Sequence, residues 1–284
     1  MKKNLLIVVI LAVCSIEMVK GQTVADSLAI VSACWKIENF QKGIVYKSAS
    51  IPQLYQGPQS ISLIEIDPVA GLKVGVAVSD KMKETSKIAS EYNAIAAING
   101  SYFDMKRGNS VCFLKADRQI IDTTMQSEFK LRVTGAINVR KGKIKLIPWS
   151  KQIEKEYEGE TGMVLASGPL MLKDGQICDW NSCGANFIRT KHPRSAVATT
   201  KEGKILLITV DGRFPEQAEG VNIPELAHLI RILGGEDALN LDGGGSTTLW
   251  LSGASDDGVV NYPCDNGRFD HAGERKVPNI LYIH

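Results

Sequence analysis

A strand, a helix and a second strand between residues 205 and 242 are the feature that most limits the fold of this chain. Ile205–Val210 and Ala238–Leu241 are short apolar runs typical of buried strands. Between them, residues 223–233 carry apolar side chains at helical spacing, and Asn222-Ile223-Pro224-Glu225 is a capping-box variant that opens a helix. This order predicts a right-handed βαβ unit with two parallel strands.

An acidic residue follows each of these strands, Asp211 after the first and Asp242 after the second. Because parallel strands end at the same edge of a sheet, we expect both carboxylates at the carboxyl edge, where ligands bind in such folds. A tight hairpin between residues 195 and 210 brings Arg194 to this edge, and the register that we infer from its turn pairs Arg194 with Asp211. A structural Arg–Asp pair at the end of a sheet is the alternative interpretation.

Three glycines, Gly243, Gly244 and Gly245, come directly after Asp242 and are followed by Ser246. Without Cβ atoms, the backbone N–H groups of such a turn can approach an anionic or sugar-phosphate group closely. The stretch matches neither the dinucleotide-binding glycine pattern nor a P-loop. A tight structural turn is the alternative.

Another buried strand, residues 94–98, ends in a polar segment that contains a glycine, Asn99-Gly100-Ser101-Tyr102. We expect this segment to form a loop that presents Asn99 and Tyr102 to a sugar. A strand-end turn with an Asx motif is the alternative.

The remaining chain predicts further strands and few helices. Residues 61–66, 72–78, 248–251 and 277–283 are predicted to be strands, with clear apolar alternation at 72–78, and residues 131–147 to form a hairpin. Residues 163–172 are an apolar stretch interrupted by Ser167-Gly168-Pro169, and residues 84–92 are expected to be helical. We therefore predict an α+β fold: a mixed β-sheet core with flanking helices and one βαβ unit that carries the site at its carboxyl edge. The Lys- and Glu-rich stretch 151–162 is expected to be a solvated connection.

The N-terminal part divides into two segments. Lys2 and Lys3 precede the apolar run 5–13, which is too short to span a bilayer and predicts a signal peptide over residues 1–21. The protein is then exported, periplasmic or secreted, with no transmembrane segment in the mature chain. Lipoprotein anchoring through Cys14 is less favoured, because Val13 is large for the residue before a lipidated cysteine.

Residues 22–58 are expected to form an N-terminal extension packed on one domain, residues 59–284. The extension begins with an amphipathic helical pattern around Val24, Leu28 and Val31.

Composition excludes several classes of partner and cofactor. The net charge is +2, and Lys/Arg runs with interleaved aromatic residues are missing from the sequence, so charge does not indicate nucleic-acid binding. No Cys/His spacing matches a zinc site, and the sequence requires no cofactor. A divalent cation at Asp242 or Asp211 is left open. Whether Cys178 and Cys183 pair across their short loop is also left open.

Ordered motifs along residues 60–284 together resemble the phosphodiester glycosidase family. They are Ala97-Ile98-Asn99-Gly100-Ser101-Tyr102-Phe103, His192-Pro193-Arg194-Ser195-Ala196, Val210-Asp211-Gly212-Arg213, Glu225-Leu226-Ala227, Asn240-Leu241-Asp242-Gly243-Gly244-Gly245-Ser246 and Arg275-Lys276-Val277-Pro278-Asn279. Ser101 and Ala218 depart from the residues that many members carry. The resemblance implies a hydrolase that cleaves a glycosyl phosphodiester, releases an N-acetylglucosamine-like sugar and exposes a phosphomonoester.

This chemistry suggests roles for the motif residues. Asp242 is the expected carboxylate at the anomeric carbon, as nucleophile or as base for water, and Asp211 is the second carboxylate. Arg194 and Arg213 are expected to bind phosphate, because a guanidinium donates to it through two N–H groups. The remaining expected substrate contacts are Asn99, Gly100, Tyr102, the backbone of Gly243, Gly244 and Gly245, Ser246, and Glu225, which is also a helix cap.

Two alternative functions remain at this point. One is a glycosidase acting on envelope polysaccharide without phosphate. The other is a non-catalytic carbohydrate- or phosphate-binding module.

Overall fold

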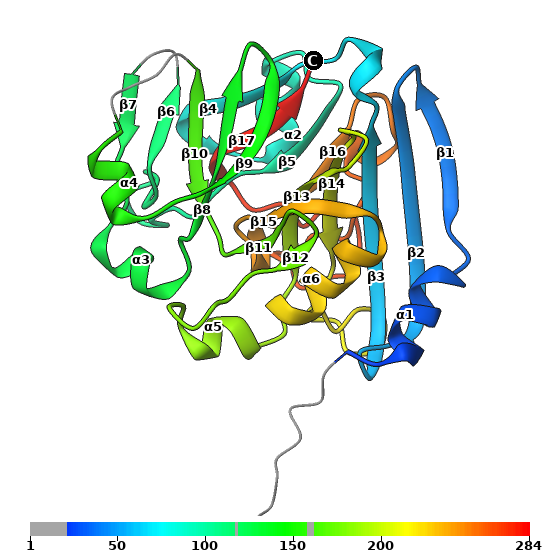
Figure 1. The fold of residues 1–284 in the computed structure, drawn as a ribbon. Helices are drawn as coiled ribbons and strands as arrows, with labels where there is room; N and C mark the ends of the chain where they lie inside the picture. Colours follow the sequence, from blue (N-terminus) through cyan, green and yellow to red (C-terminus); the bar gives the residue numbers. More distant parts are fainter. Residues whose placement is uncertain (1–21, 117–118, 158–161) are drawn as a thin grey trace, which may run out of the picture.

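The computed structural model describes residues 22–116, 119–157 and 162–284. The predicted signal peptide and Cys14 lie outside these residues. The described chain forms three β-sheets with a few short helices, which confirms the predicted α+β fold class (Figure 1). None of the helices in this part of the chain is long and apolar enough to cross a membrane.

The largest sheet has eight strands and carries most of the predicted site. Its order is β1 (Lys36–Gln41), β2 (Ile44–Leu54), β3 (Gly57–Ile66), β14 (Ile205–Val210), β13 (Arg194–Thr200), β15 (Gly235–Asn240), β11 (Leu170–Lys173) and β12 (Gln176–Ile177). The strands β1 and β2 of the N-terminal segment are thus part of this sheet, and β2 pairs with β3 across the boundary that we proposed at residue 58.

Two smaller sheets pack with it around a shared core. One contains β16 (Leu249–Leu251), β5 (Ala96–Asn99), β17 (Val277–Ile283) and β4 (Val74–Lys83). The other contains β7 (Gln119–Asp122), β6 (Leu114–Ala116), β10 (Met163–Ser167), β8 (Gly135–Arg140) and β9 (Lys143–Pro148). Buried side chains from all three sheets form one cluster, which includes Leu207 and Leu239 of the large sheet, Ile98 and Leu281 of the second, and Ile137 of the third.

The helices cover the outside of these sheets. They are α1 (Val24–Val31), α2 (Thr85–Glu91), α3 (Gln126–Leu131), α4 (Lys151–Lys155), α5 (Ala185–Arg189) and α6 (Ile223–Ile232), with short 3-10 helices η1 (Pro68–Ala70), η2 (Gly244–Ser246) and η3 (Asp256–Gly258). The buried face of α6 packs on the large sheet through Leu226 and Ile230, against Ala198 and Ile208.

Helix α4 corrects the expectation of a purely solvated connection at 151–162. Ser150 caps the helix, and Glu154 accepts hydrogen bonds from the Thr124 hydroxyl at 2.6 Å and the Trp149 indole at 2.8 Å. The polar side chains are therefore used to attach the segment to its surroundings.

Helix α1 forms where the pattern predicts it, but it faces the other way. Val24, Leu28 and Val31 are exposed, and Ile30 is the buried apolar residue of the helix. Apolar spacing identified the helix, whereas contact with the sheet selected the face that is buried.

The strands β14 and β15 both pair antiparallel with β13, which lies between them. They therefore run in the same direction and end at the same edge, without being hydrogen-bonded neighbours. The predicted pairing of Arg194 with Asp211 is wrong by one residue, since Arg194 pairs with Val210. The Thr200 N–H donates to the Lys204 carbonyl, and Gly203 has φ +81°, so a three-residue loop with a left-handed glycine sets the register.

Candidate active site

Asp242 lies just beyond the end of β15, where the two predicted strand-end segments meet. Its N–H donates to the Gly100 carbonyl at 3.0 Å, and the Asn99 amide donates to its carbonyl at 2.7 Å. The half-buried carboxylate accepts the Gly243 N–H at 3.0 Å. Burial raises the pKa of Asp242, whereas the Ser246 hydroxyl and the guanidiniums of Arg132 and Arg275 act in the opposite direction.

Each glycine of the following turn lies against a different group. A Cβ on Gly243 would lie 2.6 Å from the Pro193 carbonyl oxygen. Gly244 has φ +62°, and its Cβ would lie 2.9 Å from a guanidinium nitrogen of Arg213. A Cβ on Gly245 would overlap the Arg275 guanidinium. The glycines therefore let the turn lie directly beneath two cationic groups, as an anion-binding turn requires.

Arg132 and Arg275 complete this cationic environment, and sequence reasoning assigned neither of them a role. Arg132 follows α3 and lies 3.6 Å from the centre of the Tyr102 ring, while its Nε donates to Glu128 at 2.7 Å. Arg275 Nε donates to Asp265 at 3.1 Å. Arg275 belongs to one of the recognised motifs, whereas no motif surrounds Arg132, so only its place in the fold reveals it.

Arg194 is buried and bonded to the backbone, with 2% of its surface exposed. Its guanidinium donates to the carbonyl oxygens of Val221 at 3.1 Å, Phe187 at 3.1 Å and Thr190 at 2.8 Å. Burial lowers the pKa of Arg194 to about 10. These bonds attach α5 and the segment before α6 to β13, and they occupy much of the donor capacity that a phosphate would need.

Asp211 is buried at the end of β14 and is fully hydrogen-bonded. Its carboxylate accepts the Ser60 hydroxyl at 2.7 Å, the Asn261 amide at 2.9 Å and the Tyr262 N–H at 3.0 Å. Burial raises its pKa, and these donors oppose the rise. Asp211 therefore ties β14 to β3 and to the segment at 261–262.

The predicted sugar contacts at the end of β5 are also used inside the protein. The Asn99 side-chain oxygen accepts from the Ser195 hydroxyl at 2.6 Å and from the Thr248 N–H at 3.1 Å. The Tyr102 hydroxyl donates to the Gly168 carbonyl at 2.6 Å and accepts from Asn240 at 2.7 Å, and burial raises its pKa.

Gly100 has a packing role as well, and Ser246 is buried close to Asp242. A Cβ on Gly100 would overlap the Asn279 side chain. Ser246 is buried in η2, directly after the glycines.

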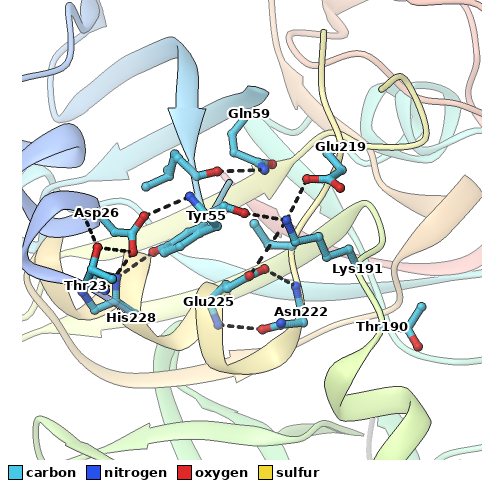
Figure 2. A network of polar contacts seen from close by, with 12 residues as sticks. Thr23, Asp26, Tyr55, Gln59, Thr190, Lys191, Glu219, Asn222, Glu225 and His228 are labelled. Carbon is cyan, nitrogen blue, oxygen red and sulfur yellow. Dashed lines mark hydrogen bonds and ion pairs between the residues drawn. The ribbon is translucent and has the colours of Figure 1, made fainter. Parts of the chain in front are cut away.

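Glu225 lies in a separate polar network at the start of α6 (Figure 2). It accepts the Asn222 N–H at 2.9 Å and completes the predicted capping box. Lys191 lies 4.0 Å from Glu225 and donates to Glu219 at 2.7 Å.

Within the described residues, no group of three His, Cys, Asp or Glu side chains is placed to hold a metal ion. Cys178 and Cys183 are both unpaired.

The chain is similar to several known proteins. The family model described as phosphodiester glycosidase matches residues 92–284. The N-acetylglucosamine-1-phosphodiester alpha-N-acetylglucosaminidase of Mus musculus is 24% identical over 205 residues, which cover 66% of this chain and 37% of that protein. The Homo sapiens protein of the same name is 24% identical over 222 residues, covering 72% of this chain and 39% of that protein. The chain thus spans about two fifths of the length of these relatives.

Solved structures share the fold. The catalytic domain of the zebrafish protein of that name, auto-inhibited by its pro-peptide, has a TM-score of 0.66 at 20% identity and covers 87% of this chain and 85% of that chain. A hypothetical protein from Synechocystis has a TM-score of 0.62 at 16% identity, over 88% of this chain and 63% of that chain. Because the family model matches most of its length, the chain belongs to the phosphodiester glycosidase family.

Proposed function

We propose that this protein hydrolyses a glycosyl phosphodiester, releasing the sugar and leaving a phosphomonoester on the other product. The observation that carries the proposal is a half-buried carboxylate, Asp242, beside a glycine turn that lies beneath the guanidiniums of Arg213 and Arg275. A phosphodiester next to an anomeric carbon needs both features, because guanidiniums match the phosphate charge and a carboxylate stabilises or attacks the carbon.

The reaction breaks the bond between the anomeric carbon and the phosphate oxygen. The electron pair leaves with that oxygen, and water supplies the hydroxyl that the sugar gains. Asp242 acts either as nucleophile or as base for this water. Arg132, Arg213 and Arg275 stabilise the charge that grows on the leaving phosphate.

The buried motif residues are better suited to positioning than to direct substrate contact. Arg194 and Asp211 already bond to protein atoms, as do Asn99 and Tyr102. In our proposal they hold the ends of β13, β14 and β5 so that Asp242 and its turn keep one geometry. Gly100 and Ser246 serve the same purpose, and Glu225 stabilises α6.

The sugar and the location are further parts of the proposal. An N-acetylglucosamine-like sugar is supported by the names of the mouse and human relatives, which act on an N-acetylglucosamine-1-phosphodiester. Export to the periplasm or the outside of the cell is supported by the predicted signal peptide.

A pair of matched substrates tests the reaction. One is an α-N-acetylglucosaminyl phosphodiester and the other is an α-N-acetylglucosaminide without phosphate. We expect cleavage of the phosphodiester alone. Cleavage of both compounds would favour a general glycosidase, and binding without turnover across a panel of glycosyl phosphates would favour a binding module.

Two acid-to-amide variants test the roles. Asp242→Asn should lower kcat by about a thousandfold or more, as removal of a reacting group does. Asp211→Asn should stay within about tenfold of the wild type, because the Ser60 hydroxyl can rotate and accept from the new amide. Near-native turnover by Asp242→Asn would refute its role, and a loss in Asp211→Asn as large as in Asp242→Asn would make Asp211 a reacting group.

A further inference from the structure

A cavity lies on the large sheet, and none of its lining residues belongs to the glycine turn. Its volume is about 600 Å³, and it is lined by β1, β2 and β3 together with residues 251–262 and His271. Ligand-binding cavities in proteins measure about 300–1,000 Å³, so it has room for a small organic group.

Hydroxyl groups line the wall of this cavity that the sheet forms. Tyr46, Ser48 and Ser50 alternate along β2, and Ser60 and Ser62 face them from β3 in register. The Tyr46 and Ser62 hydroxyls donate to the Val260 carbonyl at 2.8 and 3.2 Å, which leaves their oxygen lone pairs able to accept. Alternate serines on one face of a strand bury no apolar surface, so this wall of the cavity suits a polar ligand better than an apolar one.

Aromatic rings form another wall. The Tyr262 ring stacks on Phe269 at 4.1 Å between centroids and on His271 at 4.4 Å. His271 Nδ1 lies 2.6 Å from the Asn261 carbonyl, which can only accept, so Nδ1 carries a proton. This wall combines aromatic rings with the polar edge of an imidazole.

The charges of the cavity cancel. Lys36 and Glu38 both line it from β1 and form an ion pair at 2.6 Å. The buried Asp211 carboxylate lies behind Ser60 and accepts a hydrogen bond from the Ser60 hydroxyl. The cavity therefore differs from the cationic glycine turn, and it favours an uncharged ligand over a second phosphate.

We propose that this cavity binds a neutral sugar residue, as part of a longer glycan. A sugar ring has a rim of hydroxyls, which match the serine hydroxyls and His271, and faces of C–H groups, which match the ring of Phe40. Behind the cavity, Ser62 pairs with Thr209 and Thr209 with Ser195, whose hydroxyl bonds to Asn99, so buried residues of the sheet connect the cavity to the end of β5. This binding does not depend on the chemistry at Asp242.

The test measures binding of neutral oligosaccharides to the whole protein by isothermal titration and ligand-observed NMR. The probes are the tetrasaccharides of the cellulose, starch, chitin and mannan series, with glucose 1-phosphate as the charged comparison. We expect saturable binding of at least one neutral probe. It should weaken by at least about tenfold in Ser50→Trp, which fills the cavity from an exposed strand position, and persist in Gln53→Trp, an exposed position of the same strand outside the cavity.

Further variants keep the result decisive. If Ser50→Trp does not fold, Ser48→Ala removes a hydroxyl at little change in volume and should also weaken binding. Binding should survive in Asp242→Asn, and Ser50→Trp should hydrolyse a short phosphodiester at the wild-type rate. The proposal is overturned if no neutral probe binds, if Ser50→Trp and Ser48→Ala bind as well as the wild type, or if Asp242→Asn abolishes binding. None of these results bears on hydrolysis, which the matched substrates test separately.

Discussion

Replacing Gly245 with alanine should separate the chemistry of the glycine turn from its stability. The new methyl group would overlap the ends of the Arg275 and Asp265 side chains, both of which can move. This ion pair is partly exposed, at 22% and 36%, so its loss costs about 0.2–1 kcal/mol. Gly245 does not have a left-handed φ, so alanine fits its backbone conformation. Alanine also reduces the conformational freedom of the unfolded chain, which stabilises the folded protein by about 0.4–1 kcal/mol. The free energy of unfolding should therefore change by less than about 1 kcal/mol.

Activity should respond much more strongly. A displaced Arg275 no longer lies beside the phosphate and Asp242. Losing one hydrogen bond from a charged donor costs about 1.5–3 kcal/mol, or about 10- to 150-fold in kcat/KM. The assay is hydrolysis of the α-N-acetylglucosaminyl phosphodiester, alongside urea unfolding of the same preparation.

Gly267→Ala is the matched control in the neighbouring loop. Gly267 has φ +71°, and an added Cβ would meet open space. Alanine there should cost about 1–2 kcal/mol of stability through its left-handed backbone, and leave kcat/KM unchanged. Wild-type activity in Gly245→Ala, or an equal loss in both variants, would refute the role of Arg275.

Three further predictions concern titration and capping. If Asp242 reacts as a carboxylate, kcat/KM should fall at acidic pH with an apparent pKa above the ordinary 3.8. Arg275→Gln should move this acidic fall of kcat/KM to higher pH, because losing a positive charge disfavours ionisation of Asp242. An unchanged pH profile in this variant would contradict the prediction. His228 bonds Tyr55 at 2.7 Å (Figure 2), and burial holds its pKa below the ordinary 6.5. As the pH falls, the His228 imidazole takes up a proton in the unfolded chain before it does so in the folded protein, so the free energy of unfolding should decrease below about pH 6.5. Urea unfolding at several pH values should show a smaller decrease for His228→Gln than for the wild type. Glu225→Ala should lower stability by about 1 kcal/mol through the lost capping box and leave kcat/KM unchanged, whereas a large rise in KM would indicate substrate contact.

Local chemistry explains why much of the fold was predictable. Apolar alternation located β4, a continuous apolar run located β5, and the capping box located the start of α6. The hairpin register failed because three- and four-residue loops differ by one residue, and only the left-handed Gly203 selects between them.

The candidate site was predictable in part for a related reason. A carboxylate followed by three glycines is a local pattern, so Asp242 and its turn were recognisable as a unit. Whether Arg194, Asn99 or Tyr102 is free for substrate depends on partners such as Val221, Ser195 and Asn240, which lie 27, 96 and 138 residues away in the chain.

The sequence by itself determined part of the secondary structure, the family resemblance and the carboxylate at the glycine turn, because periodicity, capping and turn chemistry act over a few neighbouring residues. Tertiary structure alone decided which polar groups form hydrogen bonds within the protein and which surround Asp242. Arg132 and Arg275 meet Asp242 from segments 110 and 33 residues away, and the hydroxyl-lined cavity exists only because three strands align in register. Burial and hydrogen-bond satisfaction are properties of the packed molecule, and they assign each side chain its role.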